Sequence, residues 1–113
     1  MIFLASLGDE TVGVLRCIDA VGSVLLEPPR YGYISSVYVR PAARRAGVLH
    51  ALMSAAENWC EARGLDELRL HNSADNTDAG AAWERLGFRV VEVLRSRPLR
   101  LPRDRDAGGL APG

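Results

Sequence analysis

The pattern of apolar positions in the first third of the chain predicts three strands. Residues 1–7 form an apolar run, the turn signal Gly-Asp-Glu follows, and residues 11–18 form a run rich in β-branched side chains. Two such runs around a short turn predict an antiparallel hairpin. The tyrosine- and valine-rich segment 31–39 predicts a third strand, which Pro41 ends.

Helical spacing replaces this pattern in the middle of the chain. Apolar residues recur every three to four positions over residues 48–63, and Gly64 provides a C-terminal stop. The apolar stripe of this predicted helix consists of Leu49, Leu52, Met53, Ala56, Trp59 and Cys60. Leucines then alternate with charged residues over residues 65–71, which predicts a fourth strand.

A polar loop separates this strand from a second, short helix that Gly87 closes. The apolar face of that helix consists of Ala79, Ala82, Trp83 and Leu86. Residues 88–94 predict a last strand. The order β-β-β-α-β-α-β predicts an α/β fold with a mixed, partly antiparallel sheet flanked by helices. We expect a single domain over residues 1–99 and a flexible C-terminal tail over 100–113.

Charge and cysteine usage narrow the classes of function. The chain of 113 residues carries 14 basic and 14 acidic side chains, so its charge gives no reason to expect nucleic acid or an anionic membrane as a partner. Its apolar runs are too short to span a bilayer. Cys17 and Cys60 provide neither a metal-binding spacing nor a disulfide framework, so we predict a cytoplasmic protein without a metal site.

The turn that enters the long helix is the first candidate for chemistry. Arg44, Arg45 and Gly47 stand between a predicted strand and a predicted helix, where several backbone N–H groups lack partners. The helix dipole adds partial positive charge, and glycine lets a ligand approach the backbone closely. This combination is typical of phosphate sites. A solvated, charged turn without a ligand explains the same residues.

Two longer motifs extend this interpretation. The stretch VRPAARRAGVLHALM resembles the signature of the GNAT acetyltransferase superfamily. The matching residues are Val39, Pro41, Arg44 and Gly47. The stretch NTDAGAAWERLGF, residues 76–88, is similar to the second motif of that family. There Asn76, Ala79, Gly87 and Phe88 match, and Trp83 stands where tyrosine is usual.

The resemblance implies direct transfer of an acetyl group from acetyl-CoA, a co-substrate, to a primary amine on a small molecule or a peptide. Backbone groups of Val37, Tyr38 and Val39 would bind the pantetheine arm, and an N–H of Val37 or Tyr38 would stabilise the oxyanion. The pyrophosphate would lie on the amides of Arg44, Arg45, Ala46, Gly47, Val48 and Leu49. Asn76 would hydrogen-bond the cofactor near the thiol end or line its channel, and Trp83 would also belong to the cofactor site.

Three departures from the family pattern keep a second function open. Leu49 replaces a small residue, and we expect its side chain to turn into the core. Trp83 replaces a tyrosine that often protonates the departing thiolate, and indole is not a usable acid at neutral pH. The chain is also expected to begin after the family's N-terminal strand and helices. A non-catalytic acyl-CoA-binding or regulatory module is therefore the alternative, and we predict a homodimer because an edge of the hairpin over residues 1–18 stays exposed.

Candidate catalytic side chains are few. His71 ends a predicted strand, and an imidazole suits the deprotonation of an incoming ammonium group, although a hydrogen-bonded structural histidine is the more common explanation of such a position. His50 is expected on the surface. Strand alternation places Tyr31 and Tyr33 on one face and Tyr38 on the other.

Overall fold

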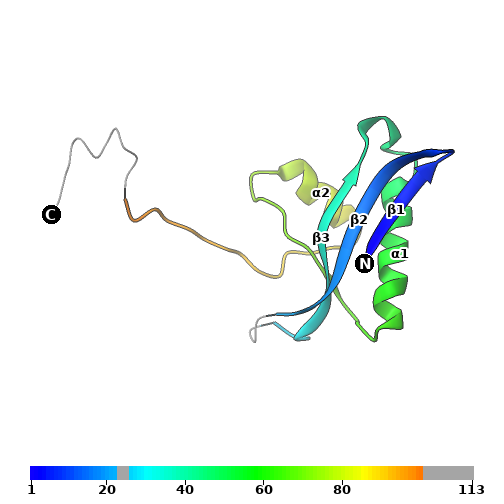
Figure 1. Cartoon of the computed structure of the whole chain (residues 1–113). Coiled ribbons are helices and arrows are strands. Elements are labelled where there is room, and N and C mark those ends of the chain that lie inside the picture. Colours follow the sequence, from blue (N-terminus) through cyan, green and yellow to red (C-terminus); the bar gives the residue numbers. More distant parts are fainter. Residues whose placement is uncertain (23–25, 101–113) are drawn as a thin grey trace.

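The structure is a computed structural model that describes residues 1–22 and 26–100. Its sheet has the strand order β1-β2-β3-β4 (Figure 1). The strands are β1 (Ile2–Leu7), β2 (Glu10–Val21), β3 (Arg30–Val39) and β4 (Leu68–Arg69). The first three pair antiparallel, whereas β4 pairs parallel to β3. The mixed α/β fold class predicted from the sequence is confirmed.

Helix α1 (Val48–Ala62) packs across one face of this sheet and forms the core with it. Its predicted stripe is confirmed: Leu52, Met53, Ala56 and Cys60 are buried, and Leu49 and Trp59 are half-buried against the same cluster. The sheet contributes Val12, Leu15, Cys17, Ile34 and Val39. Helix α2 (Thr77–Arg85) lies beyond the β4 end of the sheet (Figure 1). No helix in the described part of the chain is both long and apolar enough to cross a bilayer.

The two cysteines meet where α1 crosses the sheet. The Sγ atoms of Cys17 and Cys60 lie 3.9 Å apart, and both thiols are free and buried. Burial raises the pKa of both thiols, to about 12 for Cys60, where the adjacent Cys17 adds to the effect. The folded chain therefore retains protons that the unfolded chain loses above about pH 9, so this contribution to stability declines as the pH rises from about 9 toward 12.

A β-bulge interrupts the pairing of β2 with β3. Arg16 pairs with Ser36 and Cys17 pairs with Ile34, so Ser35 is an extra residue without a partner on β2. The extra residue shifts the alternation of β3 by one position. Tyr38, opposite Val14, therefore shares its face with Tyr33, opposite Ile18, and its predicted placement on the other face is wrong.

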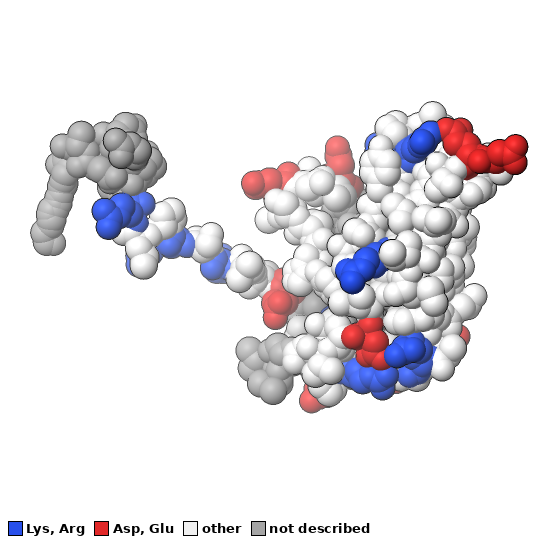
Figure 2. Space-filling model, in the orientation of Figure 1, with Lys and Arg blue, Asp and Glu red and all other residues white. Residues whose placement is uncertain are grey.

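The face of the sheet opposite α1 is open. Ile2, Leu4 and Tyr38 project from it, with 59%, 65% and 53% of their surface exposed. In the space-filling view most of the face over β1, β2 and β3 is uncharged, with one basic patch near its middle and charged side chains at its upper and lower ends (Figure 2). A sheet of this kind has one buried face and one face available for contact with another surface.

The predicted last strand is wrong. Residues 88–94 form no strand in the part of the chain that the structure describes, and Val90, Val93 and Leu94 are well exposed. β-branched residues give a segment the propensity to pair, but they do not supply its partner. Here β4, predicted over residues 65–71, is only two residues long and offers little edge. The predicted tail, 100–113, lies outside the described residues except for Arg100.

Candidate functional site

The turn between β3 and α1 exposes bare backbone amides. Gly47 is the N-cap of α1, with φ 79° and no side-chain cap, and Arg45 also has a positive φ of 72°. The first helical hydrogen bond runs from Ala51 to the carbonyl of Gly47. The N–H groups of Val48, Leu49 and His50 therefore have no acceptor among the described residues. Left-handed residues in a turn aim such groups at a common point, which favours an anion.

Side chains around this turn leave its outer surface free. Arg44, Arg45, Ala46 and Gly47 are exposed, and an added Cβ at Gly47 would meet nothing within 4 Å. Val48 and Leu49 turn toward the core, as expected for Leu49, so neither blocks the amides. The first turn of α1 carries no acidic residue that would oppose an anion.

Arg44 does not extend freely from the turn. Its Nε donates to the carbonyl of Val39 at 3.0 Å, and its guanidinium lies 5.9 Å from the centre of the Tyr38 ring. The side chain thus folds back over the end of β3 and links that strand to the turn. Arg45 makes no ion pair with another described residue, so its charge is available to an anion at the turn.

Strand β3 ends with an edge that the sheet leaves unpaired. Only Gly32 and Tyr33 pair with β4, so in the described chain the edge from Ile34 to Val39 has no neighbouring strand on that side. The predicted site residues Val37, Tyr38 and Val39 lie on this stretch and lead directly to the turn. An extended ligand can add to such an edge like a further strand while its anionic end reaches the helix.

The second predicted motif, residues 76–88, includes helix α2. Asn76 is the N-cap of α2, and its Oδ1 accepts a hydrogen bond from the Ala79 N–H at 3.1 Å. Because Oδ1 is already in use, the predicted contact of Asn76 with a cofactor would be made by its side-chain amide nitrogen, Nδ2. Trp83 is half-buried and packs edge-to-face on Phe88, with ring centroids 5.8 Å apart. Both Asn76 and Trp83 line the same cavity.

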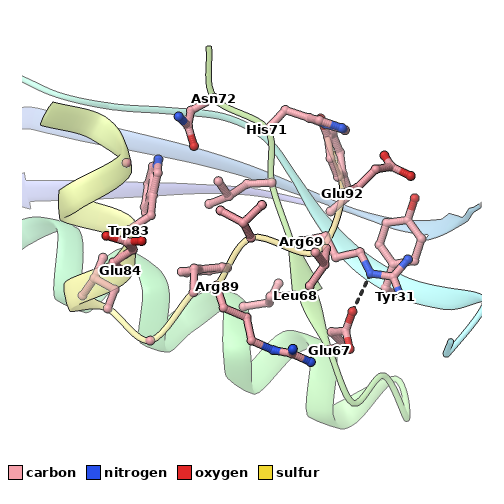
Figure 3. Close-up of a pocket in the computed structure, with 18 of the residues that line it drawn as sticks. Tyr31, Glu67, Leu68, Arg69, His71, Asn72, Trp83, Glu84, Arg89 and Glu92 are labelled. Atoms are coloured by element: carbon pink, nitrogen blue, oxygen red, sulfur yellow. Dashed lines mark hydrogen bonds and ion pairs between the residues drawn. The ribbon is translucent and has the colours of Figure 1, made fainter. Parts of the chain in front are cut away.

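That cavity has a volume of about 1300 Å³ and is lined from β3, α1, β4 and α2 and the segment after α2. Trp83 and Glu84 project from α2 on one side, and Tyr31, Arg69 and Glu92 lie on the other (Figure 3). The lining includes Tyr31 and Tyr33 of β3 but no residue of the free edge from Ile34 to Val39, so the cavity and that edge are separate parts of the candidate site.

His71 lines this cavity with a partner that the sequence did not predict. Its Nδ1 lies 2.5 Å from the Tyr33 hydroxyl, and both groups border the opening. The residues are 38 positions apart and meet because β3 and β4 are neighbours. The sequence places Tyr33 and His71 on two predicted strands. It does not give the register between these strands, so it could not predict that the two side chains meet. The predicted His50 is exposed on α1.

Comparisons with known proteins agree with this geometry. The acetyltransferase (GNAT) family model matches residues 1–88, and the chain belongs to this family. An aminoglycoside N(6')-acetyltransferase type 1 from Klebsiella aerogenes is 37% identical over 70 residues, 62% of this chain and 45% of that protein. The chain thus spans less than half the length of that relative.

Solved structures show the same fold. An aminoglycoside 6'-N-acetyltransferase from Acinetobacter haemolyticus has a TM-score of 0.76 at 26% identity, over 88% of this chain and 69% of that chain. The aminoglycoside N-acetyltransferase AAC(6')-Iy, solved in complex with CoA, has a TM-score of 0.78 at 22% identity, over 88% and 75% of the two chains.

Proposed function

We propose that this chain binds acetyl-CoA and transfers its acetyl group directly to a primary amine. The observation that carries the proposal is the set of unpaired amides at Val48, Leu49 and His50, next to the open edge of β3. The diphosphate binds at the turn, and the pantetheine arm runs along Val37–Val39. The relative from Klebsiella aerogenes, named as an acetyltransferase, supports the same activity.

The reaction needs few protein groups. A neutral amine attacks the thioester carbonyl, and a backbone N–H at Val37 or Tyr38 stabilises the negative charge on its oxygen. The leaving thiolate has an ordinary thiol pKa of about 8.5, so its departure does not require an acid from Trp83. His71 receives the proton that the acceptor ammonium must lose.

The charge of the cavity favours an ammonium acceptor. Glu57, Glu84 and Glu92 line it, and no ion pair with another described residue neutralises them. Negative charge in a cleft concentrates cations. The acceptor is therefore a small cationic amine or a peptide amino group, and aminoglycosides, the substrates in the names of the relatives, are the first compounds to test.

Measurements of acetyl-CoA binding and of turnover distinguish an acetyltransferase from a non-catalytic acyl-CoA-binding module. We expect acetyl-CoA to raise the melting temperature, and an amine panel of an aminoglycoside, a polyamine and a peptide to release CoA faster than the protein-free mixture. Chromatographic detection of CoA and of the acetylated amine measures the release. Stabilisation without release from any amine would favour the non-catalytic acyl-CoA-binding module, which the open face of the sheet also supports. Absence of stabilisation would contradict both functions.

The protein is also proposed to be a homodimer. The exposed apolar side chains of β1 and β3, including Ile2, Leu4 and Tyr38, form a surface that a second copy could cover. We expect light scattering at micromolar concentration to give twice the mass of the chain. A monomer would contradict this proposal without affecting acetyl-CoA binding.

The proposed compartment is the cytoplasm. Two free thiols 3.9 Å apart are compatible with a reducing environment, where such a pair does not become a disulfide. Recovery of the native protein outside the cytoplasmic fraction would contradict it.

A further inference from the structure

Tyr33 and His71 form one hydrogen-bonded unit at the cavity. The distance from the Tyr33 hydroxyl oxygen to His71 Nδ1 is 2.5 Å, and the rings meet edge-on with centroids 5.5 Å apart. His71 is exposed and Tyr33 half-buried, and both line the cavity. At this distance a proton can pass directly between the hydroxyl oxygen and the ring nitrogen.

A chain of contacts holds Tyr33 in place. Its ring packs edge-on against Tyr31 at 6.4 Å, and the guanidinium of Arg69 lies 4.0 Å from the centre of the Tyr31 ring. Arg69 is only 10% exposed, and it donates to Glu67 at 2.5 Å and to the carbonyl of Pro28 at 2.8 Å. A fixed tyrosine supports directed proton transfer, which depends on geometry held within a fraction of an ångström.

The chemistry of the two groups orients the bond. A neutral imidazole has one donor and one acceptor nitrogen, and a phenol is a better donor than acceptor. We assign the Tyr33 hydroxyl as the donor to Nδ1, and this assignment puts the proton of the neutral His71 ring on Nε2. In this tautomer the lone pair of His71 is already occupied, so the ring cannot take a proton directly from an amine.

We propose that Tyr33 is a catalytic residue that relays the proton from the acceptor amine to His71. The proposal rests on the transferase function proposed above. The ammonium gives a proton to the Tyr33 oxygen while the original hydroxyl proton passes to Nδ1. One N–H bond and one O–H bond break, one O–H and one N–H bond form, and the positive charge moves from the ammonium to the imidazole.

Neither residue performs this step alone. A phenol oxygen has almost no tendency to hold a second proton, so it accepts one only when its own proton leaves at the same time. Imidazole is the one side chain that ordinarily changes charge near neutral pH, which makes His71 the acceptor for that proton. Tyr33 is thus the group that touches the substrate, and His71 holds the charge.

The test uses the amine and acetyl-CoA assay with matched variants. We expect Y33F and H71Q each to lower kcat/KM about a hundredfold, the usual scale for loss of a general base. The double variant should be no slower than either single variant, since both remove the same relay. S6A removes a hydroxyl on β1, outside the cavity, and should retain most of the activity.

A pH profile and NMR distinguish the relay from a structural hydrogen bond. We expect the acid limb of the kcat/KM profile to disappear in Y33F and in H71Q and to persist in S6A. In the wild-type protein, ¹⁵N spectra of the neutral His71 ring should show the proton on Nε2, with H50Q providing the assignment.

Three results would overturn the relay alone: a proton on Nδ1 in the wild-type protein, a Y33F variant with more than half of the wild-type kcat/KM, or multiplicative losses in the double variant. No turnover of any amine by the wild-type protein would instead overturn the transferase function and the relay together.

Discussion

Replacing Gly47 with glutamate is expected to weaken acetyl-CoA binding by at least about a hundredfold, which equals about 2.8 kcal/mol. The new carboxylate would stand beside the amides of Val48 and Leu49, where the diphosphate is proposed to bind. Repulsion between like charges about 6 Å apart is about 3 kcal/mol per pair near a protein surface before salt screening, and a diphosphate presents at least two charges. The side chain would also occupy space that is empty at Gly47.

Two controls isolate the cause. Gly47→Gln adds nearly the same bulk without charge, so its loss should be several-fold smaller. Gly64→Glu places the same residue at the opposite end of α1, where φ is 75° and an added Cβ meets nothing within 4 Å. It imposes a similar backbone strain away from the proposed site and should bind acetyl-CoA normally by titration calorimetry. Equal affinities of the wild-type protein and Gly47→Glu for acetyl-CoA would show that the diphosphate does not bind at this turn.

The local parts of this site could be predicted from the sequence. A strand, a glycine-containing turn and an amphipathic helix follow one another within residues 31–63, and the amides at the start of that helix are free because of backbone geometry alone. The stripe that fixes which way α1 faces is likewise a local pattern. For this reason the turn at Gly47 and the inward side chain of Leu49 agree with the structure.

Features that depend on pairing between distant segments could not be predicted. The bulge at Ser35 depends on how β3 aligns with β2. Its one-residue shift places Tyr38 on the same face as Tyr33, whereas regular alternation predicts opposite faces. The contact of Tyr33 with His71 depends on the register of β3 against β4. Residues 88–94 have strand propensity, yet β4 is only two residues long and offers them little edge to pair with.

Gly32 is expected to be the glycine least able to accept a side chain. It is buried in β3, and an added Cβ would lie 2.4 Å from Cys60 Sγ, 3.0 Å from Leu68 Cδ2 and 3.6 Å from Cys17 Sγ. Atoms at 2.4 Å cannot coexist, so the Cys60 side chain must rotate away from Cys17, or α1 or β3 must shift. The Gly32 N–H also donates to the Glu67 carbonyl at 2.9 Å, which ties the same position to the start of β4.

Gly32→Ala should therefore lower the free energy of unfolding by about 3 kcal/mol, at the upper end of the usual cost of overpacking a core. In a domain of this size that corresponds to a fall of about 15 °C in the melting temperature. Gly80→Ala is the matched control: its nearest neighbour is Asn72 Nδ2 at 3.9 Å in an α-helix, so it should stabilise by up to ~1 kcal/mol.

A second substitution tests whether the Cys60 sulfur causes the clash. Cys60→Ala removes that atom, so Gly32→Ala in the Cys60→Ala background should cost much less than in the wild-type protein. Urea unfolding of the four variants measures the coupling energy, expected to be about 1–2 kcal/mol. Additive losses would show that the strain lies in the backbone of β3. Because β3 also carries Tyr33 and the open edge at Val37–Val39, a shift of that strand would weaken acetyl-CoA binding as well.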